Sequence, residues 1–264
     1  MKISFYEEFP IQENLGKIEL IDFPTKIIVA AKSLPEFYSI KDSVKKYKNK
    51  NIKEIIYWPI IKKEEGYWFS AFTKNSALKR IINELKQNKK PLRIMWDAEL
   101  PFYKSQTLPY LLNYIDYFKN RKIILDFFRN ASKYNIKILT SEYPIQSGFL
   151  RNFLFEIFLI SFDPRVYKNK KIAMLYTSLL RNHPYVEKFL ENQIHIGKKY
   201  FGEDFIVALG VIAKGINANE PVLRAKELER DLKIVKNMGL DEVIIYRLSG
   251  LNKEYVKVLR KFLN

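Results

Sequence analysis

Two acidic residues separated by one position, Asp97 and Glu99, give the sequence its strongest chemical signal. They follow the apolar run Leu92–Trp96, which predicts a strand, and alternate positions of a strand point to the same face. Two carboxylates held side by side repel each other, so one of them is expected to keep its proton near neutral pH and to act as a general acid. The alternative is structural: Glu99 caps a following helix and Asp97 pairs with a cation.

A third carboxylate, Glu142, ends the next predicted strand on the same face as Thr140. We expect this face to point inward, which would make Glu142 available for base or ligand chemistry; the alternative is an ion pair with Lys32 or Arg247. Arg247 itself ends the last predicted strand, where a buried guanidinium needs a carboxylate from the protein or from a substrate. A Glu7–Arg247 or a Glu142–Arg247 pair would satisfy it.

Aromatic side chains gather at the same strand ends. Each ring alone is explained by the preference of aromatic residues for strands, but rings with a polar handle beside carboxylates also suit the faces and hydroxyl edges of sugars. Their joint placement predicts a carbohydrate site. We predict catalytic roles for Asp97, Glu99, Glu142 and Tyr176, and substrate-binding roles for Glu7, Glu8, Trp58, Trp96, Tyr143, Tyr246 and Arg247.

The elements that position these residues form a regular series. Eight short β-branched or aromatic runs recur along the 264 residues, with amphipathic helical patterns between them. Strands that return in this way predict parallel βαβ units, and eight of them in about 250 residues predict a single-domain (β/α)8 TIM barrel over residues 1–264, with an insertion within 103–134. The runs are Ile3–Tyr6, Lys26–Ala31, Glu54–Trp58, Leu92–Trp96, Ile136–Thr140, Lys171–Tyr176, Phe205–Leu209 and Glu242–Tyr246.

The alternative fold is an open doubly wound sheet. Such a sheet usually carries a glycine-rich phosphate loop after its first strand, and here that turn reads Glu7-Glu8-Phe9-Pro10, without glycine. In a barrel the carboxyl ends of the strands form the catalytic face, and all the residues singled out above lie at such ends. We therefore expect them to share one mouth.

Charge and composition argue against specific nucleic-acid binding and against cysteine chemistry. The 46 Lys and Arg against 29 Asp and Glu give a net charge of +17, but the lysines fall in short separate groups, so we expect a thermophile-like solvated surface and only weak, non-specific nucleic-acid binding. The absence of Cys excludes thiolate metal sites and cysteine nucleophiles, and with only two His we predict neither a metal site nor a cofactor.

The distribution of apolar residues indicates whether the chain carries a signal peptide or a membrane-spanning helix. No signal peptide is apparent, and the most apolar stretch, residues 149–162, is too short and too charged to span a bilayer. We therefore expect a cytoplasmic protein whose partner is a small-molecule or oligosaccharide substrate.

Two short motifs resemble barrel glycoside hydrolases, more narrowly the chitinase-like ones. Asp97-Ala98-Glu99 is similar to the Asp-x-Glu that ends their fourth strand, and Met174-Leu175-Tyr176 is similar to the Met-x-Tyr of their sixth strand. The resemblance implies that Glu99 is the acid and that Asp97 and Tyr176 contact the sugar's acetamido group. The earlier acids of the family motif fall at Leu92 and Met95, and the usual Asp after the tyrosine is Thr177.

Three other classes of function stay open. A metal-dependent sugar isomerase or hydrolase would bring Glu99, Glu142 and Glu7 or Glu8 together around Mg²⁺ or Mn²⁺. A basic nucleic-acid-binding protein would show a continuous basic stripe and a steep salt dependence. A non-catalytic barrel would use the same fold as a scaffold.

Overall fold

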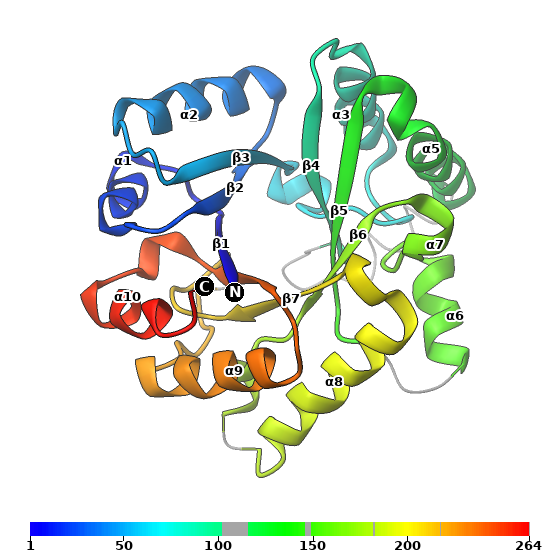
Figure 1. The fold of residues 1–264 in the computed structure, drawn as a ribbon. Coiled ribbons are helices and arrows are strands. Elements are labelled where there is room, and N and C mark those ends of the chain that lie inside the picture. Colours follow the sequence, from blue (N-terminus) through cyan, green and yellow to red (C-terminus); the bar gives the residue numbers. More distant parts are fainter. Residues whose placement is uncertain (102–115, 146–148, 182, 217, 264) are drawn as a thin grey trace. The chain divides into compact units, whose positions relative to one another are not determined.

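The computed structural model, which describes residues 1–101, 116–145, 149–181, 183–216 and 218–263, places eight parallel strands in a closed barrel in the order of the sequence (Figure 1). The predicted (β/α)8 fold is therefore confirmed, and every predicted strand is present. The strands are β1 (Lys2–Glu7), β2 (Thr25–Ala31), β3 (Ile52–Pro59), β4 (Leu92–Ala98), β5 (Ile136–Glu142), β6 (Lys170–Met174), β7 (Phe205–Gly210) and β8 (Glu242–Tyr246).

Helices follow the strands along the chain. In α9 the leucines and Val235 fall on one buried face, and this spacing is what selects a helix there. The described helices are α1 (Gln12–Leu15), α2 (Leu34–Lys46), α3 (Asn75–Gln87), α5 (Tyr117–Asn130), α6 (Phe149–Ile157), α7 (Pro164–Tyr167), α8 (Val186–Phe201), α9 (Ala225–Asn237) and α10 (Lys253–Arg260).

Two helices begin differently from what their local residues favour. Asn219-Glu220-Pro221 has residues typical of a helix start, but α9 begins only at Ala225, and the backbone N–H of Leu223 is bound to the carbonyl of Val211 at 2.7 Å. Asn75 is a residue that commonly caps helices, but here its side chain donates to Asn120 on α5 at 2.7 Å and does not cap α3. Part of the predicted insertion, residues 102–115, lies outside the described residues.

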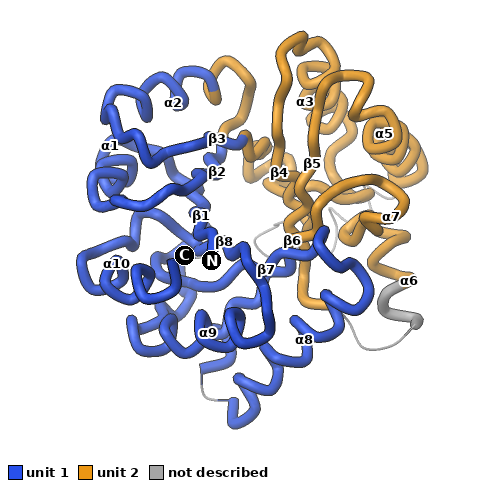
Figure 2. Tube along the Cα trace, viewed as in Figure 1, with its two compact units in different colours: residues 1–30, 38–56, 173–264 blue, residues 31–37, 57–172 orange. Residues whose placement is uncertain are grey.

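The chain forms two compact units, shown in different colours in Figure 2. Unit 1 comprises residues 1–30, 38–56 and 173–264, and unit 2 comprises residues 31–37 and 57–172. In unit 1, β1 pairs with β2 and β8, and β7 pairs with β8. In unit 2, β4 pairs with β5 along its whole length and with the end of β3.

In unit 2 the helix-facing side of β4 carries an aromatic core. The Trp96 ring stacks on Phe69 at 4.2 Å and contacts Phe127 and Phe128 of α5 at 5.9 and 5.6 Å between ring centroids. Phe128 in turn stacks on Phe162 at 4.0 Å. These contacts fix the direction of β4: its even-numbered side chains face the helices and its odd-numbered side chains, including Asp97, face the opposite side.

In unit 1 the side chains of β1, β7 and β8 also alternate between the helix side of the sheet and the opposite face. Val207 of β7 lies beside Val243 of β8 in the apolar layer that the helices cover, and Gly197 of α8 leaves room for the ring of Phe205 on the same face. The next residues along the strands turn the other way. Tyr6 and Tyr246 are therefore cross-strand neighbours on the face opposite the helices.

Candidate active site

The candidate acid pair stands at the carboxyl end of β4 in unit 2. Asp97 is buried, and the register of β4 with β5 places it directly beside Ser141, on the face away from the helices. Glu99 follows one residue past the end of β4 and is half-buried. Its carboxylate shares a hydrogen bond with the hydroxyl of Tyr143, which lies one residue past the end of β5.

The electrostatics of Tyr143 show how closely these three groups interact. Burial raises the pKa of the Tyr143 hydroxyl, and the negative charge of Glu99, its hydrogen bond and the charge of Asp97 raise it further. The hydroxyl therefore keeps its proton at neutral pH. Tyr143 donates a hydrogen bond to the Glu99 carboxylate when Glu99 is ionised.

A loop that carries Trp68 is bound to the end of β4. The backbone N–H of Phe69 donates to the carbonyl of Asp97 at 3.0 Å, so the loop after β3 is fastened to the end of β4. The ring of the preceding Trp68 contacts the ring of Tyr67 at 5.6 Å between centroids. Trp68 is half-buried, whereas Trp58 and Trp96 are buried.

Glu142 lies on the opposite face from the one predicted. The register pairs it with Ala98, so it points to the helix side, and its partner is Lys171 rather than Lys32 or Arg247. The reason is that alternation within β5 leaves two choices of face, and the register with β4 decides between them. Trp96, predicted to bind substrate, belongs to the aromatic core and exposes no ring surface.

In unit 1, a second carboxylate and tyrosine meet at the ends of β1 and β8. The hydroxyl of Tyr246 donates to Glu8, and the rings of Tyr176 and Tyr6 lie 5.4 and 6.1 Å from the Tyr246 ring. Burial, and after it the charge of Glu8, raises the pKa of Tyr246 well above its ordinary value. Both Glu8 and Tyr246 are buried, and a Cβ added to Gly215 would overlap the Tyr246 hydroxyl.

The neighbouring residues Glu7 and Arg247 form the predicted ion pair, at 2.7 Å. The backbone N–H groups of Phe9 and Ser249 also donate to the Glu7 carboxylate, at 2.9 and 2.8 Å. Arg247 additionally donates to the carbonyl of Lys214 and lies 4.6 Å from the Phe9 ring centroid. Protein atoms thus occupy the hydrogen-bonding groups that were predicted to bind substrate.

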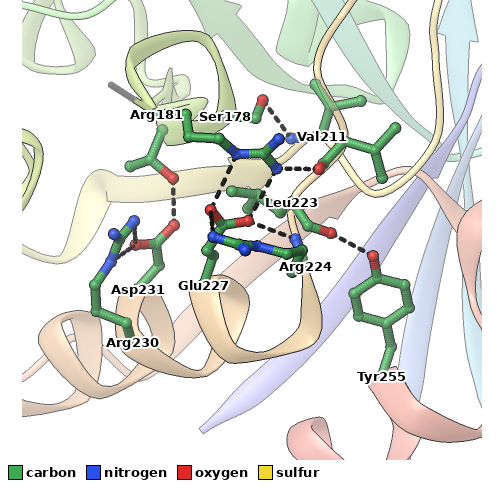
Figure 3. A network of polar contacts seen from close by, with 11 residues as sticks. Ser178, Arg181, Val211, Leu223, Arg224, Glu227, Arg230, Asp231 and Tyr255 are labelled. Atoms are coloured by element: carbon green, nitrogen blue, oxygen red, sulfur yellow. Dashed lines mark hydrogen bonds and ion pairs between the residues drawn. The ribbon is translucent and has the colours of Figure 1, made fainter. Parts of the chain in front are cut away.

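A polar network in unit 1 holds the segment between β7 and α9, residues 211–224. Figure 3 shows Glu227 of α9 between Arg181 and Arg224, to which it is bound at 2.9 and 3.0 Å. Arg181 also donates to the carbonyl of Val222, and Ser178 accepts the N–H of Val211 at 3.0 Å. This segment carries Gly215, so the network fixes the backbone that covers Tyr246.

The position where the glycosidase motif has an aspartate belongs to the same network. Thr177 is buried and donates its hydroxyl to Asp231 of α9, which also binds Arg230 at 2.7 Å. An acid is therefore present near this strand end, but it is supplied by a helix. Among the described residues, no three His, Asp or Glu side chains group as ligands for a metal ion.

Comparison with known proteins finds the same fold in several solved structures. No family model matches the chain, and no curated protein matches it either. A solved structure of the PgaB (BpsB) glycoside hydrolase domain from Bordetella bronchiseptica is similar over 100% of this chain and 99% of that chain, with 11% identity and a TM-score of 0.64. The fold is that of barrel glycoside hydrolases. The predicted resemblance is thus confirmed at the level of the fold.

Two further structures show how widely this fold is used. A GH18 chitinase from Pseudoalteromonas aurantia is 10% identical, with a TM-score of 0.58 and full coverage of both chains. A D-tagatose 3-epimerase-like protein is 15% identical, with a TM-score of 0.54 over 99% of this chain and 97% of that chain. Hydrolases and epimerases therefore share the architecture, and the choice between them depends on the side chains. Within the described part of the chain, no helix has the length and apolar character to cross a membrane.

Proposed function

We propose that this protein is a glycoside-hydrolase-like enzyme in which Glu99 donates the proton to the departing glycosidic oxygen. The observation that carries the proposal is the contact between Glu99 and Tyr143 beside the buried Asp97, at the carboxyl ends of β4 and β5. In a barrel, chemistry is built at these ends, and a carboxyl pair is what glycoside hydrolysis requires.

Glu99, Tyr143 and Asp97 each have a role in breaking the glycosidic bond. Protonated Glu99 gives its proton to the oxygen of the scissile bond while that bond breaks, and the carboxylate left behind accepts the hydrogen bond of Tyr143. Because Tyr143 keeps its proton, it stabilises the charged form of Glu99 that the reaction creates. Asp97 orients the substrate or stabilises the positive charge that develops at the sugar carbon.

The second catalytic role depends on the substrate. A sugar with an N-acetyl group can use its own amide oxygen as the nucleophile, with Asp97 orienting that amide. For a sugar without it we assign the second role to Asp97, either as the nucleophile or as the base that activates a water. In every route a water molecule finally supplies the hydroxyl that the sugar carbon gains. Glu142 has no part in either route, because it is buried on the other face of the sheet and paired with Lys171.

The test is a panel of oligosaccharides and aryl glycosides, with and without N-acetyl groups, assayed with and without EDTA. Hydrolysis of one member by the wild-type chain, and its loss in the E99Q variant at equal folding, would support the proposal. The D97N variant then tests the role of Asp97. A modest loss of activity indicates that Asp97 orients the substrate, and a loss as large as that of E99Q indicates that it is the nucleophile or the base. Activity that disappears on chelation, or that survives in E99Q, would contradict the assignment.

A further inference from the structure

The ion pair between Glu142 and Lys171 is buried to an unusual degree in unit 2. Only 3% of the Glu142 side chain and 5% of the Lys171 side chain are exposed. Glu142 also accepts the hydroxyl of Thr140 at 2.7 Å and the N–H of Phe162 at 3.1 Å, and Lys171 donates to Ser161 at 2.9 Å. The pair thus joins the end of β5, the segment before α7 and the start of β6.

Stability alone is a poor explanation for such a pair. Removing two charges from water costs free energy that their attraction often only offsets, and an apolar pair of the same volume commonly stabilises a fold as well or better. What charged groups add is direction, because each oxygen and each N–H must meet a partner at one geometry. The pair therefore fixes a position in the chain.

The residue whose position it fixes is Tyr143. Glu142 and Tyr143 are consecutive and point to opposite faces, so the carboxylate anchors the peptide that carries the tyrosine. A second path reaches the same ring: Phe155 of α6 contacts the Tyr143 ring at 5.9 Å, and its carbonyl accepts the N–H of Ile160 at 3.0 Å, in the segment that Glu142 holds through Phe162.

We propose that the Glu142–Lys171 pair is a positioning device that holds the Tyr143 hydroxyl against Glu99. This inference rests on the proposed function, because it assigns the pair a role in the reaction that Glu99 performs. Glu142 and Lys171 touch no substrate in this scheme. They act through the backbone and through Phe155.

The test compares E142Q/K171Q, which removes both charges and keeps hydrogen-bonding groups, with Y143F and with the combination of the two. The readout is the titration of the Glu99 carboxyl by NMR of ¹³C-labelled glutamate, assigned with E99Q. Loss of the donated hydrogen bond should move this titration to higher pH, since such a bond favours the charged carboxylate. We expect E142Q/K171Q to move it in the same direction as Y143F and to add nothing when Y143F is already present.

The kinetic arm uses the sugar identified by the substrate panel. A misplaced catalytic group commonly costs up to about 10²-fold, so we expect kcat/KM of E142Q/K171Q to fall about 10- to 100-fold with a shifted pH profile. The matched control is K26Q/E242Q, which removes a Lys–Glu pair at the amino ends of β2 and β8, bound at 2.8 Å with 29% and 20% of the side chains exposed. It should leave both readouts unchanged.

A Glu99 titration in E142Q/K171Q identical to wild type would overturn the inference and leave the pair a purely structural one. If that variant does not fold, E142D replaces it, because it keeps both charges and shortens the side chain of residue 142 by one methylene. The Glu99 titration is then measured in E142D. The NMR arm needs no turnover, so a failure of the proposed function, seen as wild-type hydrolysis by E99Q, is distinguished from a failure of the positioning role.

Discussion

The two units repeat one arrangement at their strand ends and use it differently. In unit 1, the buried Glu7–Arg247 pair lies next in sequence to the contact between Glu8 and Tyr246. In unit 2, Glu142 is bound to Lys171 and is followed by Tyr143, which is bound to Glu99. In both, a buried ion pair lies next in sequence to a carboxylate–tyrosine contact.

The difference lies in access. In unit 1 Glu8 and Tyr246 are both buried, and the backbone at Gly215 covers the tyrosine hydroxyl. In unit 2 Glu99 and Tyr143 are half-buried. The same contact therefore serves packing where it is covered and can serve chemistry where solvent and a ligand reach it.

The largest expected effect separates the two carboxylates by activity. E99Q should lower kcat/KM by roughly 10²–10⁴-fold, the range for loss of a general acid, whereas E8Q should lower it by less than about 10-fold and mainly reduce stability. Steady-state assays on the sugar from the substrate panel, with thermal unfolding as the folding control, check both. An E8Q enzyme as impaired as E99Q would show that the unit 1 contact also takes part in the reaction.

The ion pairs can be compared by unfolding in urea. Replacing one partner leaves a buried charge alone, so R247M and K171M should each lower the free energy of unfolding by about 3–5 kcal/mol. The exposed pair between Lys45 and Asp42 provides the control, and K45M should change the free energy of unfolding far less than R247M or K171M. Equal, small effects in all three variants would mean that the buried pairs hold nothing in place.

The cover over Tyr246 can be tested with glycine substitutions. In G215A the new Cβ would overlap the Tyr246 hydroxyl and lie 3.0 Å from Glu8, so the segment must move and stability should fall by about 1–3 kcal/mol. G16A is the control, because a Cβ there meets nothing within 4 Å and the backbone is helical at φ −57°. It should be neutral or slightly stabilising, as measured by thermal unfolding.

The smallest expected effect concerns two acids of α9 in unit 1, which should respond to pH in opposite ways. Burial opposes the charge of Glu227, but its hydrogen bonds to Arg224 and Arg181 outweigh burial and lower its pKa to about 2. Its contribution, about 1 kcal/mol after solvent screening of the arginines, should be present above its ordinary pKa and lost as pH falls toward 2. Unfolding of E227Q and wild type between pH 2 and 7 measures it.

For Asp231 the direction is reversed. Burial raises its pKa, although Thr177 and Arg230 lower it in part. Its contribution should be largest below the ordinary pKa of an aspartate and should decline as pH rises through the raised value. D231N should therefore differ from wild type in the opposite sense to E227Q across the same pH range. Parallel curves for the two variants would contradict this assignment.

Much of the fold could be predicted because strands and helices have periods that a sequence displays. The eight β-branched runs predicted the barrel and placed Asp97 at the end of β4, but Trp96, which was predicted to bind substrate, faces the helices. The face of Glu142 could not be found in this way, since it depends on register with a neighbouring strand. Contacts between distant segments, such as Tyr143 with Glu99, leave no periodic signal at all.

Loops are the second part of the structure that could not be predicted from the sequence. Asn219-Glu220-Pro221 has the composition of a helix start, yet tertiary hydrogen bonds keep the chain irregular until Ala225. Trp68 lies in a loop held by the carbonyl of Asp97, a contact that only the folded chain creates. In both cases a long-range hydrogen bond overrides the local preference.

The pairing of β1 with β8 has a consequence for how the chain is made. Residues 2–6 find their partners at residues 242–246, so during synthesis one edge of β1 stays open while more than two hundred residues leave the ribosome. Unit 2 is nearly continuous in sequence, from residue 57 to 172, and can assemble first. Unit 1 must wait for its last segment, and until then its exposed strand edge is where a chaperone would bind or where aggregation would begin.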